Sequence, residues 1–220
     1  MSDYRRVCII VEGHSELNFV KNVLSPYCAE RGVYVVCYLV SKPGQRGGDV
    51  KFSRTRRDIV ASLQAKDNPL VCSFVDYYGI KEWPGIKNIP ANASPKQIAD
   101  SLNREAITEI EQCEPKSVHR YIPFLAVHEF EALLFSDGDI LADYLNIDKR
   151  LVASVLSQYG SPERINNSIL TAPSKRIETW NKDYVKARDG HQIAALIGIS
   201  KIRKACPLFD EWLNQIGIND

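Results

Sequence analysis

Three apolar runs of this 220-residue chain each lead directly into side chains that can do acid–base or metal chemistry. The candidate catalytic residues are Glu12, Glu16, Asp76, His128, Glu129 and Glu131. Carboxylates that share one site repel each other unless a cation or a proton lies between them. Mg²⁺ and Mn²⁺ prefer oxygen ligands, and two or three carboxylates plus water suffice to bind them. Such a site suits phosphodiester hydrolysis, because the cation neutralises developing charge and generates hydroxide.

Within this set we assign Glu12, Asp76 and Glu129 as metal ligands, with Glu16 in an outer shell or at a second metal. For Glu12 the alternative is a helix-capping role, where a negative charge is favoured. His128 could relay protons or contact phosphate, or could be a structural histidine at a helix start. It would neighbour Glu131 if that helix begins at His128.

The elements that position these side chains follow from the apolar pattern. Residues 7–11 predict a strand buried on both faces, and Gly13 permits the turn into an amphipathic helix. Residues 33–40 predict a second buried strand, completing a right-handed βαβ unit. Further strands are expected at 70–75 and 121–127. The predicted fold is therefore α/β, a Rossmann-like, mostly parallel sheet flanked by helices.

Parallel strands place their carboxyl ends on the same rim of a sheet, where open α/β folds bind their ligands. If the first and third strands are neighbours, Glu12 and Asp76 come within reach of one cation. The chain after residue 139 has a pattern of short helices. We therefore expect an α/β core over residues 1–138 and a helical C-terminal extension or subdomain over residues 139–220.

Two basic regions could hold a phosphate backbone. One is a glycine-rich loop and helix start over residues 41–57, and the other follows residue 174. The candidate phosphate-binding residues are Lys42, Arg46, Arg54, Lys175, Arg176, Lys201 and Arg203. The alternatives are a solvated helix face for the first region and surface ion pairs for the second.

The composition excludes several classes of protein. A net charge of +1 excludes a generally basic nucleic-acid coat, so any nucleic-acid contact must be local. The six cysteines include no CxxC pair, which favours reduced core thiols in a cytoplasmic protein. No stretch is apolar for long enough to predict a membrane span or a signal peptide.

Several motifs resemble the DUF4276 family over roughly residues 7–214. The matching segments are 11–16 (VEGHSE), 76–79 (DYYG), 128–135 (HEFEALLF), 171–177 (TAPSKRI) and 202–209 (IRKACPLF). That family is regarded as Toprim-like and similar to the Toprim domains of OLD-type nucleases. The resemblance implies a Toprim glutamate at Glu12, which often acts as general base, and the first acid of an Asp-x-Asp pair at Asp76. Tyr78 stands where the second acid is expected, so Glu16, Glu129 or Glu131 would have to complete the ligand set.

The resemblance implies a Mg²⁺- or Mn²⁺-dependent nuclease acting on DNA or RNA. It also implies an AAA- or ABC-type ATPase encoded alongside and a role in anti-phage defence. The alternatives are a catalytically inactive Toprim-like partner of an ATPase or nucleic acid, and a small-molecule phosphotransferase or phosphohydrolase. The sequence does not indicate an oligomeric state.

Overall fold

The computed structural model describes residues 5–41, 51–165, 168 and 170–219. Its sheet consists of four parallel strands in the order β2-β1-β3-β4. The strands are β1 (Arg5–Val11), β2 (Val33–Leu39), β3 (Leu70–Asp76) and β4 (Phe124–Ala126). The first and third strands are neighbours, which meets the condition for Glu12 and Asp76 to approach each other, and their carboxyl ends meet on one rim.

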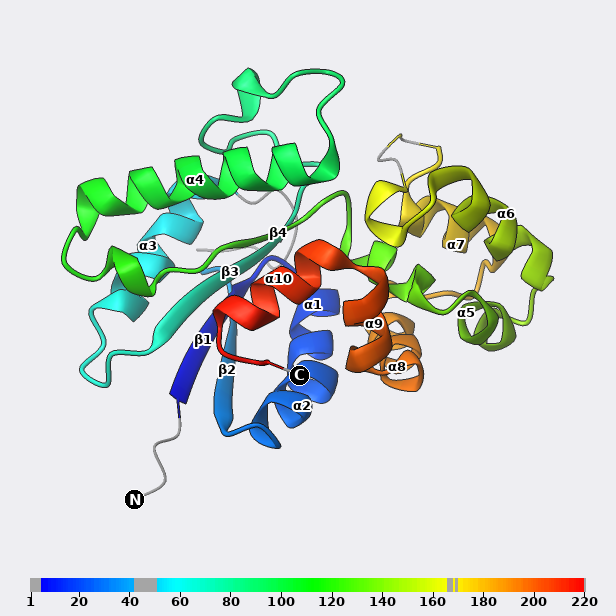
Figure 1. Ribbon diagram of the computed structural model, residues 1–220, viewed down its shortest axis with the longest axis horizontal. Coiled ribbons are helices and arrows are strands. Elements are labelled where there is room, and N and C mark those ends of the chain that lie inside the picture. Colours follow the sequence, from blue (N-terminus) through cyan, green and yellow to red (C-terminus); the bar gives the residue numbers. More distant parts are fainter. Residues whose placement is uncertain (1–4, 42–50, 166–167, 169, 220) are drawn as a thin grey trace.

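Helices cover both faces of this sheet (Figure 1). On one face lie α3 (Phe52–Leu63) and α4 (Pro95–Cys113). On the other lie α1 (His14–Phe19), which continues through η1 (Val20–Leu24) into α2 (Ser25–Ala29), together with α10 (Pro207–Gln215). The predicted α/β fold with helices flanking a parallel sheet is confirmed.

The chain after the sheet is helical, also as predicted. Its elements are η4 (Phe130–Ser136), α5 (Gly138–Leu145), α6 (Lys149–Tyr159), η5 (Pro162–Arg164), α7 (Pro173–Trp180), α8 (Lys186–Ile197), α9 (Ile199–Ala205) and α10. Two short 3₁₀ turns, η2 (Ile86–Asn88) and η3 (Val118–Arg120), lie within the α/β part. The domain boundary at residues 138 and 139 stays a prediction.

Aromatic packing joins α10 to the sheet. Trp212 stacks on Phe124 of β4, with ring centroids 4.8 Å apart, and Phe209 packs against the same ring at 5.7 Å. The start of α10 is held by Glu163, whose two carboxyl oxygens each accept a backbone N–H, from Leu208 and Phe209, at 3.0 Å. The last helix is therefore part of the core, and it covers the face of the sheet that also carries α1.

Two local expectations were wrong. Residues 33–39 form the edge strand of the sheet, and Tyr34 and Tyr38 are 58% and 48% exposed, because an uninterrupted apolar run does not distinguish an edge from a centre. No helix begins at His128, since η4 starts at Phe130.

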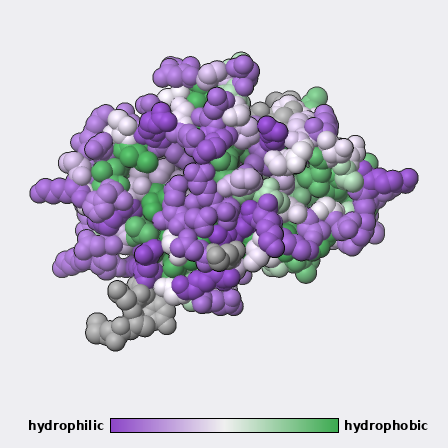
Figure 2. Space-filling model, viewed as in Figure 1, coloured by the Kyte–Doolittle hydropathy of each residue, from purple (hydrophilic) through white to green (hydrophobic). Residues whose placement is uncertain are grey.

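Hydrophilic side chains cover most of the face in Figure 2, and a hydrophobic patch is visible toward the α6 end. No helix among the described residues combines the length and apolar character needed to cross a membrane.

Candidate functional site

Five carboxyl groups gather at the carboxyl ends of the strands, and we call them the acidic cluster. They are Glu12, Glu16, Asp76, Glu129 and Glu131. Strand register explains why they meet. Val11 pairs with Phe74, and Asp76 pairs with Ala126, so the loops after β1, β3 and β4 begin side by side. Adjacent strands are separated by about 4.8 Å.

Backbone contacts fix the loops after β3 and β4 to each other. The N–H of Tyr77 donates to the carbonyl of Ala126 at 2.9 Å, and the N–H of Tyr78 donates to that of His128 at 2.7 Å. His128 adopts a φ of 73°, a left-handed conformation that costs energy for a residue with a Cβ atom. This turn redirects the chain so that Glu129 and Glu131 are both buried.

Asp76 ends β3 and is held by the loop that follows β4. Its Oδ1 accepts the backbone N–H of Phe130 at 2.9 Å. Burial raises the pKa of Asp76 well above its ordinary range, and the charges of Glu16, Glu131, Glu12 and Glu129 raise it further. Asp76 therefore lies within the electrostatic reach of every other member of the acidic cluster.

Glu16 reaches the same place from the first turn of α1 and is 6% exposed. Burial raises the pKa of Glu16, and the nearby charge of Glu12 adds to that rise. A Cβ atom at Gly13 would lie 2.8 Å from Oε2 of Glu16, so a larger residue there would displace the carboxylate. The Glu-Gly pair thus allows Glu12 and Glu16 to share one space, as the spacing predicted.

Glu129 is held by the start of α7. Its Oε2 accepts the backbone N–H of Ser174 at 2.9 Å, and its Oε1 accepts the hydroxyl of the same residue at 2.8 Å. These two bonds fix the orientation of the Glu129 carboxylate. They use one lone pair on each oxygen, and Nζ of Lys186 donates to Oε1 as well, at 3.4 Å.

Glu131 faces a lysine that belongs to the first turn of α8. The Nζ of Lys186 lies 3.4 Å from Oε1 of Glu131 and 3.4 Å from Oε1 of Glu129. Burial raises the pKa of Glu131 to about 7, although the charge of Lys186 lowers it. Burial lowers the pKa of Lys186, but Glu131 and Glu129 outweigh that effect, so the net change is a rise and the ammonium stays charged.

His128 lies at the border of the cluster without joining it. It is 8% exposed, and its ring packs near that of Tyr77 at 6.3 Å between centroids. Burial lowers the pKa of His128 to about 4, so the imidazole is neutral at pH 7. Its Nδ1 has no hydrogen-bond partner among the described residues. The condition under which His128 and Glu131 would be helix neighbours is not met, because η4 begins at Phe130, and a role of His128 in proton relay or phosphate contact stays a prediction.

The donor chemistry of the acidic cluster fits Mg²⁺ or Mn²⁺, because every side chain offers carboxylate oxygen. Oε1 of Glu131 is buried and accepts no hydrogen bond within the described part of the chain, and its ion-pair partner there is the Lys186 ammonium at 3.4 Å, so the oxygen keeps a lone pair that a cation could use. No group of three His, Cys, Asp or Glu side chains among those residues is already arranged as metal ligands. Binding a cation therefore requires side-chain rotation, which glutamates provide readily.

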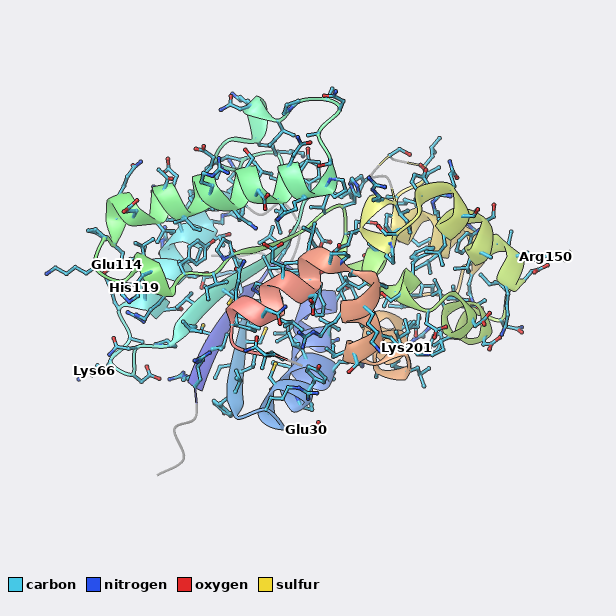
Figure 3. The ribbon with its side chains drawn as sticks, viewed as in Figure 1. Glu30, Lys66, Glu114, His119, Arg150 and Lys201 are labelled. Atoms are coloured by element: carbon cyan, nitrogen blue, oxygen red, sulfur yellow. The ribbon has the colours of Figure 1, made fainter. Side chains whose placement is uncertain are left out.

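The predicted basic residues are dispersed. Lys42 and Arg46 lie outside the described residues, while Arg54 lies on α3 and is half-buried. Lys175 pairs with Glu178 on its own helix, and Lys201, which Figure 3 labels, pairs with Asp137. Each of these ion pairs lies within the C-terminal half.

Two predicted phosphate-binding arginines have structural partners instead. Arg176 donates to the carbonyl of Thr171 at 2.7 Å and to the Tyr159 hydroxyl at 3.1 Å. Arg203 is buried and contacts Asp210 and Asn214 of α10. The alternative interpretation of this region was a set of surface ion pairs: Lys175 and Lys201 form such pairs, whereas Arg176 and Arg203 make internal contacts.

Lys186 and Ser174 were not singled out by the sequence reasoning. Ser174 lies in the segment 171–177 that carries the family resemblance, and this was the available signal. Lys186 offered none, because a single lysine at the start of a helix has no distinctive local pattern.

Comparisons with known proteins place the chain in one family. The family model described as "Domain of unknown function (DUF4276)" matches residues 11–217. A search of curated proteins finds no match. Among solved structures, the chain is similar to the C-terminal region of the Burkholderia pseudomallei OLD protein, with 16% sequence identity, a TM-score of 0.47 and 97% of each chain covered.

Proposed function

The chain belongs to the DUF4276 family, and we propose that its acidic cluster binds Mg²⁺ or Mn²⁺ and hydrolyses phosphodiester bonds in DNA or RNA. One observation carries this proposal. Five carboxyl groups gather beyond three neighbouring strand ends, and burial together with their mutual charge raises the pKa of Asp76, Glu16 and Glu131. Such an excess of buried negative charge is costly unless protons or cations compensate for it.

In this proposal Glu12 and Asp76 hold the cation, as the sequence predicted. Glu129 is the predicted third ligand, but both of its oxygens already accept bonds from Ser174. We therefore propose Glu131, whose Oε1 accepts no hydrogen bond from a described residue, as the side chain that completes the set. A divalent cation here would supply charge neutralisation and a water of lowered pKa.

The protein's own groups would then orient the reaction. The N–H of Phe130 fixes the Asp76 carboxylate, and Ser174 fixes that of Glu129. Lys186 supplies a fixed positive charge beside these acids, which favours the anionic phosphate. The Glu12 side chain follows β1 directly and is half-buried, so it can also accept a proton from the attacking water.

A cleavage assay tests the proposal. Supercoiled plasmid and end-labelled RNA are incubated with wild type, Glu12→Gln and Asp76→Asn in Mn²⁺ and Mg²⁺. We expect the wild type to cut at least one polymer, and both variants to lose about 100-fold or more, because a ligand to the cation is removed. Glu30→Gln is the matched control, since its side chain is 78% exposed. Figure 3 labels Glu30, which directly follows α2.

Other outcomes would favour the alternative functions. No cleavage by wild type, even with the neighbouring ATPase supplied, would indicate a binding-only protein, in line with Tyr78 in place of an acid. Release of phosphate from nucleotides without polymer cleavage would indicate a phosphohydrolase. The ATPase partner and the defence role rest on the family resemblance alone, and co-purification of the two gene products would test the first of them.

A further inference from the structure

A cavity of about 720 Å³ opens beside the start of α3, outside the acidic cluster. One wall is the first turn of α3, and the other is the loop over residues 81–88. The N–H of Phe52 donates to the carbonyl of Glu82 at 3.2 Å and ties the two walls together. The volume is within the range of about 300–1,000 Å³ that is typical of small-ligand sites.

The charged groups that line this cavity favour an anion. Four are cations and two are acids: Lys51, Arg56, Lys81, Lys87, Glu82 and Glu109. Lys51 pairs with Glu82 at 3.0 Å, and Arg56 pairs with Glu109 at 3.7 Å. Lys81 and Lys87 are exposed and form no ion pair with another described residue. The cavity therefore carries two uncompensated positive charges.

A buried donor in the wall points to the same kind of ligand. Trp83 is 6% exposed, and its indole N–H has no acceptor among the described residues. The ring is held against Phe52 in an edge contact, with 4.9 Å between centroids. A buried donor without an acceptor destabilises the protein, and a ligand oxygen that accepts from it would remove that cost. Every unpartnered group identified in this wall is thus a donor or a cation.

The beginning of α3 adds partial positive charge. This helix has 12 residues, and the side chain of its N-terminal residue, Lys51, provides no cap. Backbone N–H groups at such an end favour anions and bind phosphate in many proteins. Ser53, in the first turn, also lines the cavity and offers a hydroxyl.

The chain itself connects this cavity to the acidic cluster. Lys81 follows Asp76 by five residues, which limits the distance between their Cα atoms to about 18 Å. Successive phosphates of one DNA strand advance about 3.4 Å along the helix axis, so roughly five phosphates span that distance. One polynucleotide strand can therefore contact both places.

We propose that this cavity binds a backbone phosphate of the polynucleotide on which the acidic cluster acts. The identity of the polymer rests on the proposed function, whereas the binding of a phosphate anion does not. Lys81, Lys87 and the indole N–H of Trp83 are the groups that hold the phosphate. Contacts of this kind position a strand without reading its sequence.

The test is binding without catalysis. Fluorescence anisotropy of labelled 20-nucleotide DNA and RNA is measured in EDTA over a range of KCl concentrations. The double variant Lys81→Ala/Lys87→Ala is expected to bind about 5- to 10-fold more weakly, and its salt slope should fall by about 0.7 for each phosphate that it no longer neutralises. Trp83→Phe keeps the ring but lacks the N–H, and we expect it to bind about 3-fold more weakly at every salt concentration.

The matched control is Lys66→Ala/Lys116→Ala, which removes the same charge from exposed positions away from the cavity; Figure 3 labels Lys66. Equal affinities and slopes for the two double variants would overturn the proposal. Equal affinities for inorganic pyrophosphate and for the oligonucleotide would also overturn the proposal. The cavity would then be a site for a free phosphate compound. The binding assay measures no cleavage, so its result can be interpreted even if the cleavage assay finds no nuclease activity.

Discussion

Replacement of Lys186 by methionine should lower the free energy of unfolding by about 2 kcal/mol at pH 8 in EDTA. The ammonium lies 3.4 Å from both Glu129 and Glu131, and removing it leaves those buried charges uncompensated. Breaking a fully buried pair costs about 3–5 kcal/mol, and the smaller value here reflects the 38% exposure of the Lys186 side chain. Urea denaturation provides the measurement.

The loss should depend on pH and on divalent cations. Burial raises the pKa of Glu131 to about 7, so at pH 6 most Glu131 is already protonated and less charge is left unpaired. The penalty should therefore shrink between pH 8 and pH 6. Adding Mn²⁺ at pH 8 should restore stability, because the cation replaces the missing ammonium.

Lys182→Met, at an exposed position four residues earlier, serves as the control and should be neutral. If Lys186→Met were as stable as this control at pH 8 in EDTA, the ion pairs would not compensate for the acidic cluster.

Asp76→Asn should stabilise the protein in EDTA by about 1–3 kcal/mol at pH 8 while abolishing metal-dependent activity. Asparagine keeps the oxygen that accepts the Phe130 N–H and removes a charge that Glu16 and Glu131 repel. Functional sites commonly exchange stability for activity in this way.

The direction of the pH effect follows from the raised pKa of Asp76, for which burial is the main cause and the neighbouring carboxylates the second. Because the pKa of Asp76 is raised by folding, protonated Asp76 contributes stability that is complete below the ordinary pKa of 3.8. That contribution is lost as the pH rises through the pKa of Asp76 in the folded protein. At high pH the wild type is therefore destabilised by the buried Asp76 carboxylate, whereas the neutral asparagine of the variant has no such charge.

Thermal denaturation between pH 5 and pH 8 should show the gain growing with pH. A loss of stability at pH 8 would mean that the folded protein stabilises Asp76 as a carboxylate. Repulsion from the other acids of the cluster would then not be the dominant effect. Adding Mn²⁺ should raise the melting temperature of the wild type and leave that of the variant unchanged.

The parts of the site that the sequence predicted are those with a local signal. Apolar runs that end in Glu12 and Asp76 identify two central strands, and their shared rim follows from parallel pairing. The Glu-Gly spacing correctly predicted that Glu12 and Glu16 approach each other. In the register observed here, Val11 pairs with Phe74 and Asp76 with Ala126, which brings the ends of β1, β3 and β4 together.

What the sequence did not predict depends on long-range contacts. Lys186 joins the acidic cluster only because α8 packs against α1, where Asn18 donates to the carbonyl of Ala187 at 2.7 Å. His128 has a left-handed backbone and its carbonyl accepts the N–H of Tyr78, a bond between two loops that are far apart in the chain. The unpartnered indole N–H of Trp83 becomes visible only once its surroundings are known.

Crystals grown in EDTA and then soaked in Mn²⁺ test the central claim most directly, through anomalous diffraction at the manganese edge. The account predicts a peak about 2.0–2.3 Å from carboxylate oxygens of Glu12 and Asp76, with Glu131 turned toward it. The absence of a peak at the acidic cluster would contradict the account. A distance of more than about 8 Å between the carboxyl groups of Glu12 and Asp76 would also contradict it, since no single cation could then bind both.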